Sequence, residues 1–357
     1  MTRLAPRAGM RGVTLVEMMV ALVLGLLVAG AAMSVFLANK QTYIAAESIG
    51  KLQANARVAF ELMARDLREA TANACGTNLS AAANVVNNPT SRWYTDFGNG
   101  IAGYDGATPF ADAAFGTAEG KRVAGTDAVE IKSTAPEMVA VRNHNPTSAQ
   151  ILLNTPDHDL VAGDIAVICD AQHAAIFQVT NVQAGASPSL VHNTGTGTPG
   201  NCSQGLGVPV ICSPPTGTSY RFGCAFGGSD ATIDCTLDEN KWAAYVARLQ
   251  ALRWYVGCNG RADCANAAGR SLYRSRLDTS AGKPVVEQDE IAEGVTGLSL
   301  AYLVDGEDAY VAPSAVSDWR QVVAVEVALE LTSQHLVDGT PVQRELTHVV
   351  ALRSRAP

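Results

Sequence analysis

The pattern of hydrophobic positions begins with one long apolar run near the N-terminus. Val13 to Ala38 is apolar apart from Thr14, Glu17 and Ser34. As a helix this run would be about 39 Å long, at about 1.5 Å a residue, and a hydrocarbon core is about 30 Å thick. An ordinary signal peptide has an apolar core of only about 7–15 residues. We therefore predict that residues 13–38 are a retained transmembrane half of a longer helix.

After this run the pattern stays helical but becomes amphipathic. Apolar residues recur at intervals of three and four: Ile49, Leu52, Ala56, Ala59, Met63, Leu67 and Ala70. This spacing places them on one face of a helix, which is expected to pack against a folded domain. Arg57 and Glu61 have the spacing of a helix-stabilising ion pair. Because no proline occurs between Val13 and Ala70, we predict one continuous helix, with residues 39–72 as its amphipathic half.

Beyond residue 72 the period changes to short alternations of apolar and polar residues. The clearest runs from Gln321 to Leu331, and others begin at Ile165, Leu298 and Leu346. Alternation of this kind indicates half-buried strands. We predict an α+β fold, in which the C-terminal half of the helix packs on an antiparallel β-sheet head domain, residues 73–357. The segments 75–125 and 183–217 are rich in small and polar residues and are predicted to be loops.

Composition and cysteine usage narrow the class of protein. The chain is 47% hydrophobic and 17% charged with a net charge of −8, which fits a folded domain and argues against general nucleic-acid binding. Its eight cysteines lack C-x-x-C spacing and fit disulfides formed in an oxidising compartment. They are Cys75, Cys169, Cys202, Cys212, Cys224, Cys235, Cys258 and Cys264. Short intervals favour the pairs Cys258–Cys264, Cys224–Cys235 and Cys202–Cys212, which would leave Cys75 and Cys169 to join distant segments.

The N-terminus has two features that a plain anchor does not need. The basic leader, residues 1–12, ends at Gly12, and Glu17 places a carboxylate four residues into the apolar run. A charge in hydrocarbon costs several kcal/mol near the bilayer centre and less toward the interface, so Glu17 needs a partner. Cleavage between Gly12 and Val13 would create an α-amino cation, and the amine of a neighbouring subunit could then neutralise Glu17.

These residues resemble the motif recognised by prepilin peptidases. Gly12-Val13-Thr14-Leu15-Val16-Glu17 matches its order, although the family more often has phenylalanine where this chain has Val13. The resemblance implies cleavage after Gly12 by a prepilin peptidase, methylation of Val13, and Glu17 as the assembly acid. It also implies that residues 13–38 pass from the inner membrane into the core of a filament.

Shorter motifs along the chain resemble minor pilins of the PilW family. They include Leu52-Gln53-Ala54-Asn55-Ala56-Arg57, Gly163-Asp164-Ile165, Ser271-Leu272-Tyr273-Arg274, and Trp319 followed by Val322-Val323-Ala324-Val325. The resemblance implies a subunit that initiates or caps type IV pili together with other minor pilins, the major pilin and a tip adhesin. Such a subunit supports twitching motility, adhesion or DNA uptake. It would span the inner membrane of a Gram-negative bacterium once, with a periplasmic head, and then reach the pilus surface.

The usual local signatures of enzymes are missing from this sequence. There is no H-E-x-x-H, G-x-S-x-G or Walker motif, so we predict no enzymatic activity and no cofactor. Asp305, Glu307 and Asp308 could bind calcium through their carboxylate oxygens. This candidate is weak, because the residues lack EF-hand spacing and an ordinary solvated turn explains them. Two alternatives remain open: a pseudopilin of a type II secretion system, and a membrane-anchored periplasmic enzyme or ligand-binding protein.

Overall fold

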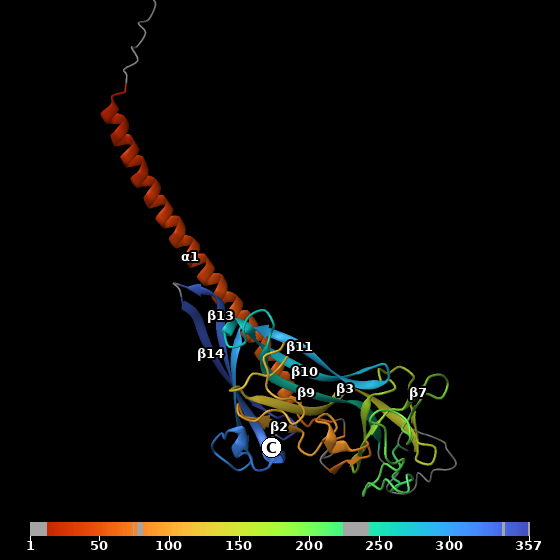
Figure 1. Cartoon of the computed structure of the whole chain (residues 1–357). Helices are drawn as coiled ribbons and strands as arrows, with labels where there is room; N and C mark the ends of the chain where they lie inside the picture. The colour runs from red at the N-terminus through yellow and green to blue at the C-terminus, as the bar shows by residue number, and fades with distance from the viewer. Residues whose placement is uncertain (1–12, 74, 77–80, 224–242, 338–339, 356–357) are drawn as a thin grey trace, which may run out of the picture. The chain divides into compact units, whose positions relative to one another are not determined.

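The computed structural model describes residues 13–73, 75–76, 81–223, 243–337 and 340–355. The leader 1–12 and the Cys224–Cys235 pair lie outside the described residues. By their internal contacts, the described residues form two units: 13–51 together with 333–342, and 52–332 together with 343–355. Helix α1, Leu15–Arg68, contributes residues to both. Figure 1 labels this helix and the main strands.

Helix α1 begins two residues later and ends four residues earlier than the predicted span of 13–72. Glu17 lies in its first turn and Arg65 and Arg68 in its last, where each charge complements the helix dipole. The helix ends as Thr71 adopts a left-handed backbone conformation, with φ of 64°. The single helix that the absence of proline predicts is therefore present.

The strands form two sheets among the described residues. Their bounds are β1 Ala83–Asn84, β2 Ile101–Tyr104, β3 Ala128–Asn145, β4 Gln150–Leu153, β5 Ile165–Cys169, β6 Ala174–Gln178, β7 Asn181–Gln183, β8 Ser189–Val191, β9 Ala244–Cys258, β10 Arg270–Ser280, β11 Lys283–Glu293, β12 Val295–Val304, β13 Val322–Val337 and β14 Thr340–Ala351. The larger sheet has the order β1-β6-β5-β9-β3-β4-β8-β7, with β10 and β11 added beside β9 and β2 beside β3. The smaller sheet has the order β12-β13-β14. Within the described ranges, short 3₁₀ helices lie at 89–91, 267–269, 313–315 and 319–321.

Almost all of the described strand pairs are antiparallel, and β1 with β6 is a parallel pair. Strands β9, β10 and β11 run side by side in Figure 1, as their registers require. The α+β fold class with a mostly antiparallel sheet is therefore confirmed. The structure differs from the expectation in having a second sheet and in placing short strands β1, β2 and β8 inside the segments predicted to be loops.

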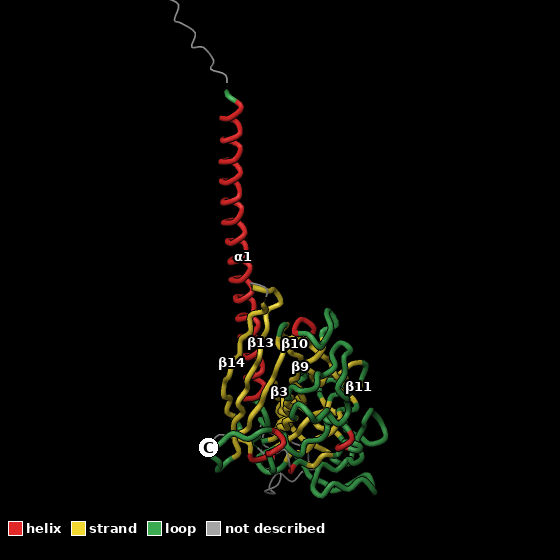
Figure 2. Tube along the Cα trace, turned by 60° about the vertical axis from the view of Figure 1, so that its left-hand side comes forward, coloured by secondary structure: helices red, strands yellow, loops and turns green. Residues whose placement is uncertain are grey.

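The apolar face of the second half of α1 lies in the main hydrophobic core. Leu52, Ala56, Ala59, Met63 and Leu67 are at most 4% exposed and share one cluster with residues of β3, β9, β12, β13 and β14. Burying one large apolar side chain contributes about 1.5–3 kcal/mol, so this stripe is a main attachment of residues 52–68 to the sheets. Figure 2 shows the helix in red and the strands in yellow.

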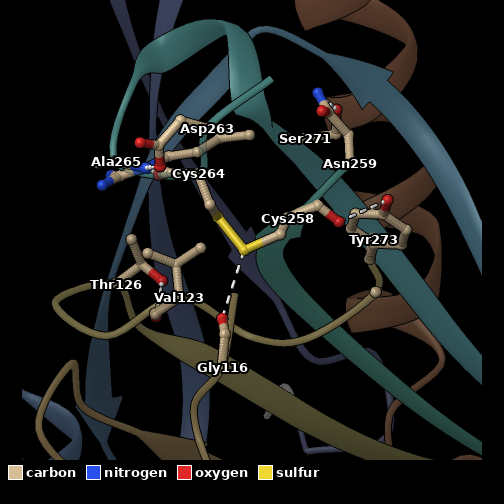
Figure 3. Close-up of a disulfide and its surroundings, with 12 residues drawn as sticks. Gly116, Val123, Thr126, Cys258, Asn259, Asp263, Cys264, Ala265, Ser271 and Tyr273 are labelled. Atoms are coloured by element: carbon tan, nitrogen blue, oxygen red, sulfur yellow. Dashed lines mark hydrogen bonds between the residues drawn. A yellow bond between two sulfur atoms is a disulfide. The ribbon is translucent and has the colours of Figure 1, made fainter. Parts of the chain in front are cut away.

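Three disulfides join described residues. Cys258 pairs with Cys264 and Cys202 with Cys212, both across short intervals, while Cys75 pairs with Cys169 over 94 residues. Figure 3 shows the Cys258–Cys264 bond at the end of β9, where the Cys258 sulfur lies 3.3 Å from the carbonyl oxygen of Gly116. The Tyr273 hydroxyl donates to the Cys258 carbonyl at 3.0 Å. The end of β9 is thus held by both covalent and polar contacts.

Candidate processing and assembly site

Thr14 and Glu17 close the start of α1 with reciprocal hydrogen bonds. The Thr14 hydroxyl accepts from the Glu17 backbone N–H at 3.2 Å, and the Glu17 Oε2 accepts from the Thr14 backbone N–H at 2.9 Å. The Thr14 hydroxyl also donates to Oε2 at 3.0 Å. This is the capping-box arrangement, in which a threonine and a glutamate three residues later satisfy each other's free N–H groups. The Glu17 carboxylate therefore lies at the first turn of the helix.

Sequence reasoning recognised Glu17 but missed the role of Thr14. The spacing Thr-x-x-Glu in front of an apolar run is itself the signal for a capping box, so the pairing could have been found from the sequence. Thr14 orients the carboxylate without neutralising it, because a hydroxyl and an amide carry no net charge. A cation is still needed if the acid enters an apolar environment.

The first half of α1 carries exposed apolar side chains. Its large apolar side chains, from Val13 to Leu37, are 48–77% exposed. Among the described residues, α1 is the one helix long and apolar enough to cross a membrane. Because so much contiguous apolar surface is unfavourable in water, this segment requires lipid or other apolar helices around it.

Val13 is exposed and lies before the helix begins, whereas Gly12 lies outside the described residues. A nitrogen atom at Val13 would precede the first hydrogen-bonded turn. An amine created there would be free of the helical hydrogen-bond pattern and would add positive charge near Glu17.

A second polar cluster holds the other half of α1 to the large sheet. The Asp66 Oδ2 accepts from Trp254 Nε1 at 2.9 Å, and Oδ1 accepts from Arg274 Nη2 at 3.0 Å. Asp66 is 3% exposed, and this burial raises its pKa although Arg274 opposes the shift. Spacing along the chain does not indicate this contact, because its partners lie far away on β9 and β10.

The weak calcium candidate lies on an exposed turn after β12. Asp305, Glu307 and Asp308 are all exposed there. Within the ranges that the structure describes, no group of three or more His, Cys, Asp or Glu side chains is arranged to hold a metal ion. The segment 195–200, which matches G-x-G-x-x-G, is a loop in which the Gly200 N–H donates to Gln178 Oε1 at 2.7 Å. The glycines of this segment are therefore part of a turn.

One comparison with known proteins bears on this site. A family model described as the prokaryotic N-terminal methylation motif matches residues 7–33, which include Gly12, Val13, Thr14 and Glu17. No curated protein is significantly similar to the chain. The motif indicates a type IV pilin-like or pseudopilin-like protein, a class of structural proteins that a prepilin peptidase processes. With the apolar helix, it is consistent with anchoring in the inner membrane and a periplasmic head.

Proposed function

Starting from this N-terminal motif, we propose that the chain is a minor pilin of the PilW family that takes part in assembling a type IV pilus. In this proposal a prepilin peptidase cuts after Gly12 and the new amine of Val13 is methylated. The observation that carries the proposal is the exposed apolar half of α1, which starts with a capped but uncompensated Glu17 inside the matched motif.

The proposed mechanism is exchange of lipid for other helices around residues 13–38. In the membrane the Glu17 carboxylate lies near the interface, where a charge costs less than at the centre. During assembly the α-amino group of a neighbouring subunit approaches Glu17 and forms an ion pair. In a low-dielectric filament core this pairing favours insertion in one register, because any other axial position leaves a charge without a partner.

The proposed partners follow from this arrangement. They are other minor pilins and the major pilin through the apolar helix, a tip adhesin through the head, and the prepilin peptidase at Gly12. The head would lie in the periplasm before assembly and at the pilus surface afterwards. Through the pilus, the subunit would support twitching motility, adhesion or DNA uptake.

Replacement of Glu17 by alanine tests the assembly step. We expect Glu17→Ala to insert into the membrane as well as wild type, because the apolar run stays intact, but to be lost from sheared pili. Glu61→Ala, an exposed glutamate on the same helix, is the matched control and should assemble normally. Unchanged incorporation of Glu17→Ala would refute the paired-acid mechanism. Loss of protein secretion rather than of pili on deletion of the gene would favour the pseudopilin alternative.

A further inference from the structure

A cavity of about 210 Å³ lies over the large sheet, away from the N-terminal motif. Its floor includes Arg253 of β9, Ser275 of β10 and Gln288 of β11. The registers pair Ser275 with both Arg253 and Gln288, so these three side chains form one row on the same face. The segment 110–122 and Trp93 complete the wall. The cavity is therefore built from adjacent strands and one covering segment.

Arg253 is held in place by two aromatic rings and two carboxylates. Its carbon Cζ lies 4.1 Å from the centre of the Trp93 ring and 4.2 Å from that of Phe110, which are cation–π distances. Its Nε pairs with Glu130 at 3.0 Å, and its Nη1 pairs with Asp112 at 2.8 Å.

The third nitrogen, Nη2, is buried and has no hydrogen-bond partner among the described residues. Arginine can bind one carboxylate through two parallel N–H···O contacts. Asp112 instead reaches Nη1 alone, and its side chain is 46% exposed, so it occupies the edge incompletely. A buried donor without an acceptor is unfavourable. An incoming carboxylate that took the place of Asp112 and bridged Nη1 and Nη2 would satisfy both.

The charge of the lining also favours an anion. Within the described residues, the cavity is lined by the cations Lys121, Arg122 and Arg253 and by one carboxylate, that of Asp112. Arg122 is 3% exposed, and its Nη1 and Nη2 donate hydrogen bonds to backbone carbonyl oxygens, which carry no net charge. Burial lowers the pKa of Arg122 to about 10, so it remains cationic at neutral pH.

The cavity wall is fixed in position by the end of β9. Gly120 N–H donates to the Cys258 carbonyl at 2.8 Å, and Cys258 N–H donates to the Lys121 carbonyl at 3.0 Å. The disulfide of Cys258 with Cys264 lies at the same point (Figure 3). The lining of this cavity of about 210 Å³ also includes the apolar side chains of Trp93, Phe110 and Val286.

From this geometry we infer that the cavity is a binding site for small monocarboxylates with an apolar body no larger than one ring. The carboxylate meets the Nη1 and Nη2 edge of Arg253 in place of Asp112, while the apolar body lies against the aromatic wall. This site is independent of cleavage after Gly12 and of pilus assembly. A result that refutes this binding site would therefore leave the function proposed above unaffected.

Benzoate, benzamide and benzylamine share one ring and differ in charge, so they separate recognition of the carboxylate from burial of the ring. We would measure their binding to the full chain in detergent by calorimetry at constant ionic strength. Wild type should bind benzoate about tenfold more tightly than benzamide, since a charged hydrogen-bond pair replaces a neutral one, and should bind benzylamine least.

Two variants test where benzoate binds without removing Arg253 from the core. Asp112→Asn should bind benzoate more tightly than wild type, because it removes the competing charge. Gln288→Glu should bind it about tenfold more weakly, because it adds an anion to the lining of the cavity. Gln172→Glu makes the same change on an exposed turn elsewhere and should behave as wild type. Equal affinity of wild type for benzoate and benzamide, or equal benzoate affinity of the Gln288→Glu and Gln172→Glu variants, would overturn the inference.

Discussion

Replacing Asp66 by alanine should reveal how the second half of α1 is held to the large sheet. The carboxylate is the acceptor for both Trp254 Nε1 and Arg274 Nη2, and it is 3% exposed. Asp66→Ala leaves the indole N–H and the guanidinium without their acceptor. Removing one partner of a buried pair costs about 3–5 kcal/mol, so we expect a loss of that size in the free energy of unfolding.

Asparagine at the same position separates the hydrogen bond from the charge. Burial raises the pKa of Asp66, which means that the folded chain disfavours the ionised form more than the unfolded chain does. Ionisation of Asp66 therefore lowers the stability of the folded chain, and stability falls as the pH rises from the ordinary pKa of 3.8 through the raised pKa of the folded chain. Asp66→Asn keeps an acceptor for Trp254 and should cost only about 1 kcal/mol.

Urea unfolding of the full chain in detergent, followed by tryptophan fluorescence, measures both variants. Glu61→Ala is the control on the same helix, because its ion pair with Arg57 is exposed to solvent and should contribute little to stability. The reasoning would be refuted if Asp66→Ala cost no more than Glu61→Ala. It would also be refuted if the alanine and asparagine variants were equally unstable.

Three further predictions concern other parts of the chain. Thr14→Val removes the helix cap, which contributes about 1 kcal/mol, and should reduce incorporation into sheared pili, while Thr14→Ser should restore it. Replacing Cys75 and Cys169 by alanine should lower the free energy of unfolding, measured in urea, by about 4–5 kcal/mol. Removing the Cys258–Cys264 disulfide, which closes a loop of only six residues at the end of β9, should lower it by about 2 kcal/mol. Burial lowers the pKa of both His144 and His192, the latter to about 3, so the unfolded chain takes up protons first. As the pH falls below about 6.5, the free energy of unfolding should therefore decrease by about 1.4 kcal/mol per pH unit for each of the two histidines. Urea unfolding at several pH values measures this slope, and His192→Gln should reduce it.

The helix and part of the smaller sheet were predictable because their patterns are regular. Val325, Val327 and Leu329 alternate with less buried residues in β13, and Leu298 and Leu300 do so in β12. A strand with one buried face leaves this period in the sequence. The amphipathic stripe of α1 is detectable for the same reason.

The large sheet was harder to predict because several of its strands are buried on both faces. The last eight residues of β9 are all buried, so no alternation marks them. Buried charged residues make β3 and β9 still harder to predict. Glu130 forms ion pairs with Lys132 and Arg253, and the pair with Arg253 forms only after the two strands have paired. The cavity over Arg253 depends on this long-range pairing and on the segment that covers it, so spacing along the chain could not indicate it.

The most direct test of the proposed function is the intact mass and N-terminal sequence of the protein from cells with and without their prepilin peptidase. We predict a mature chain beginning with methylated Val13 only when the peptidase is present, and an unprocessed chain beginning with Met1 when it is absent. An unprocessed chain beginning with Met1 in both strains would contradict the account. Residues 13–38 would then be an ordinary membrane anchor, and Glu17 would have no new amine to pair with.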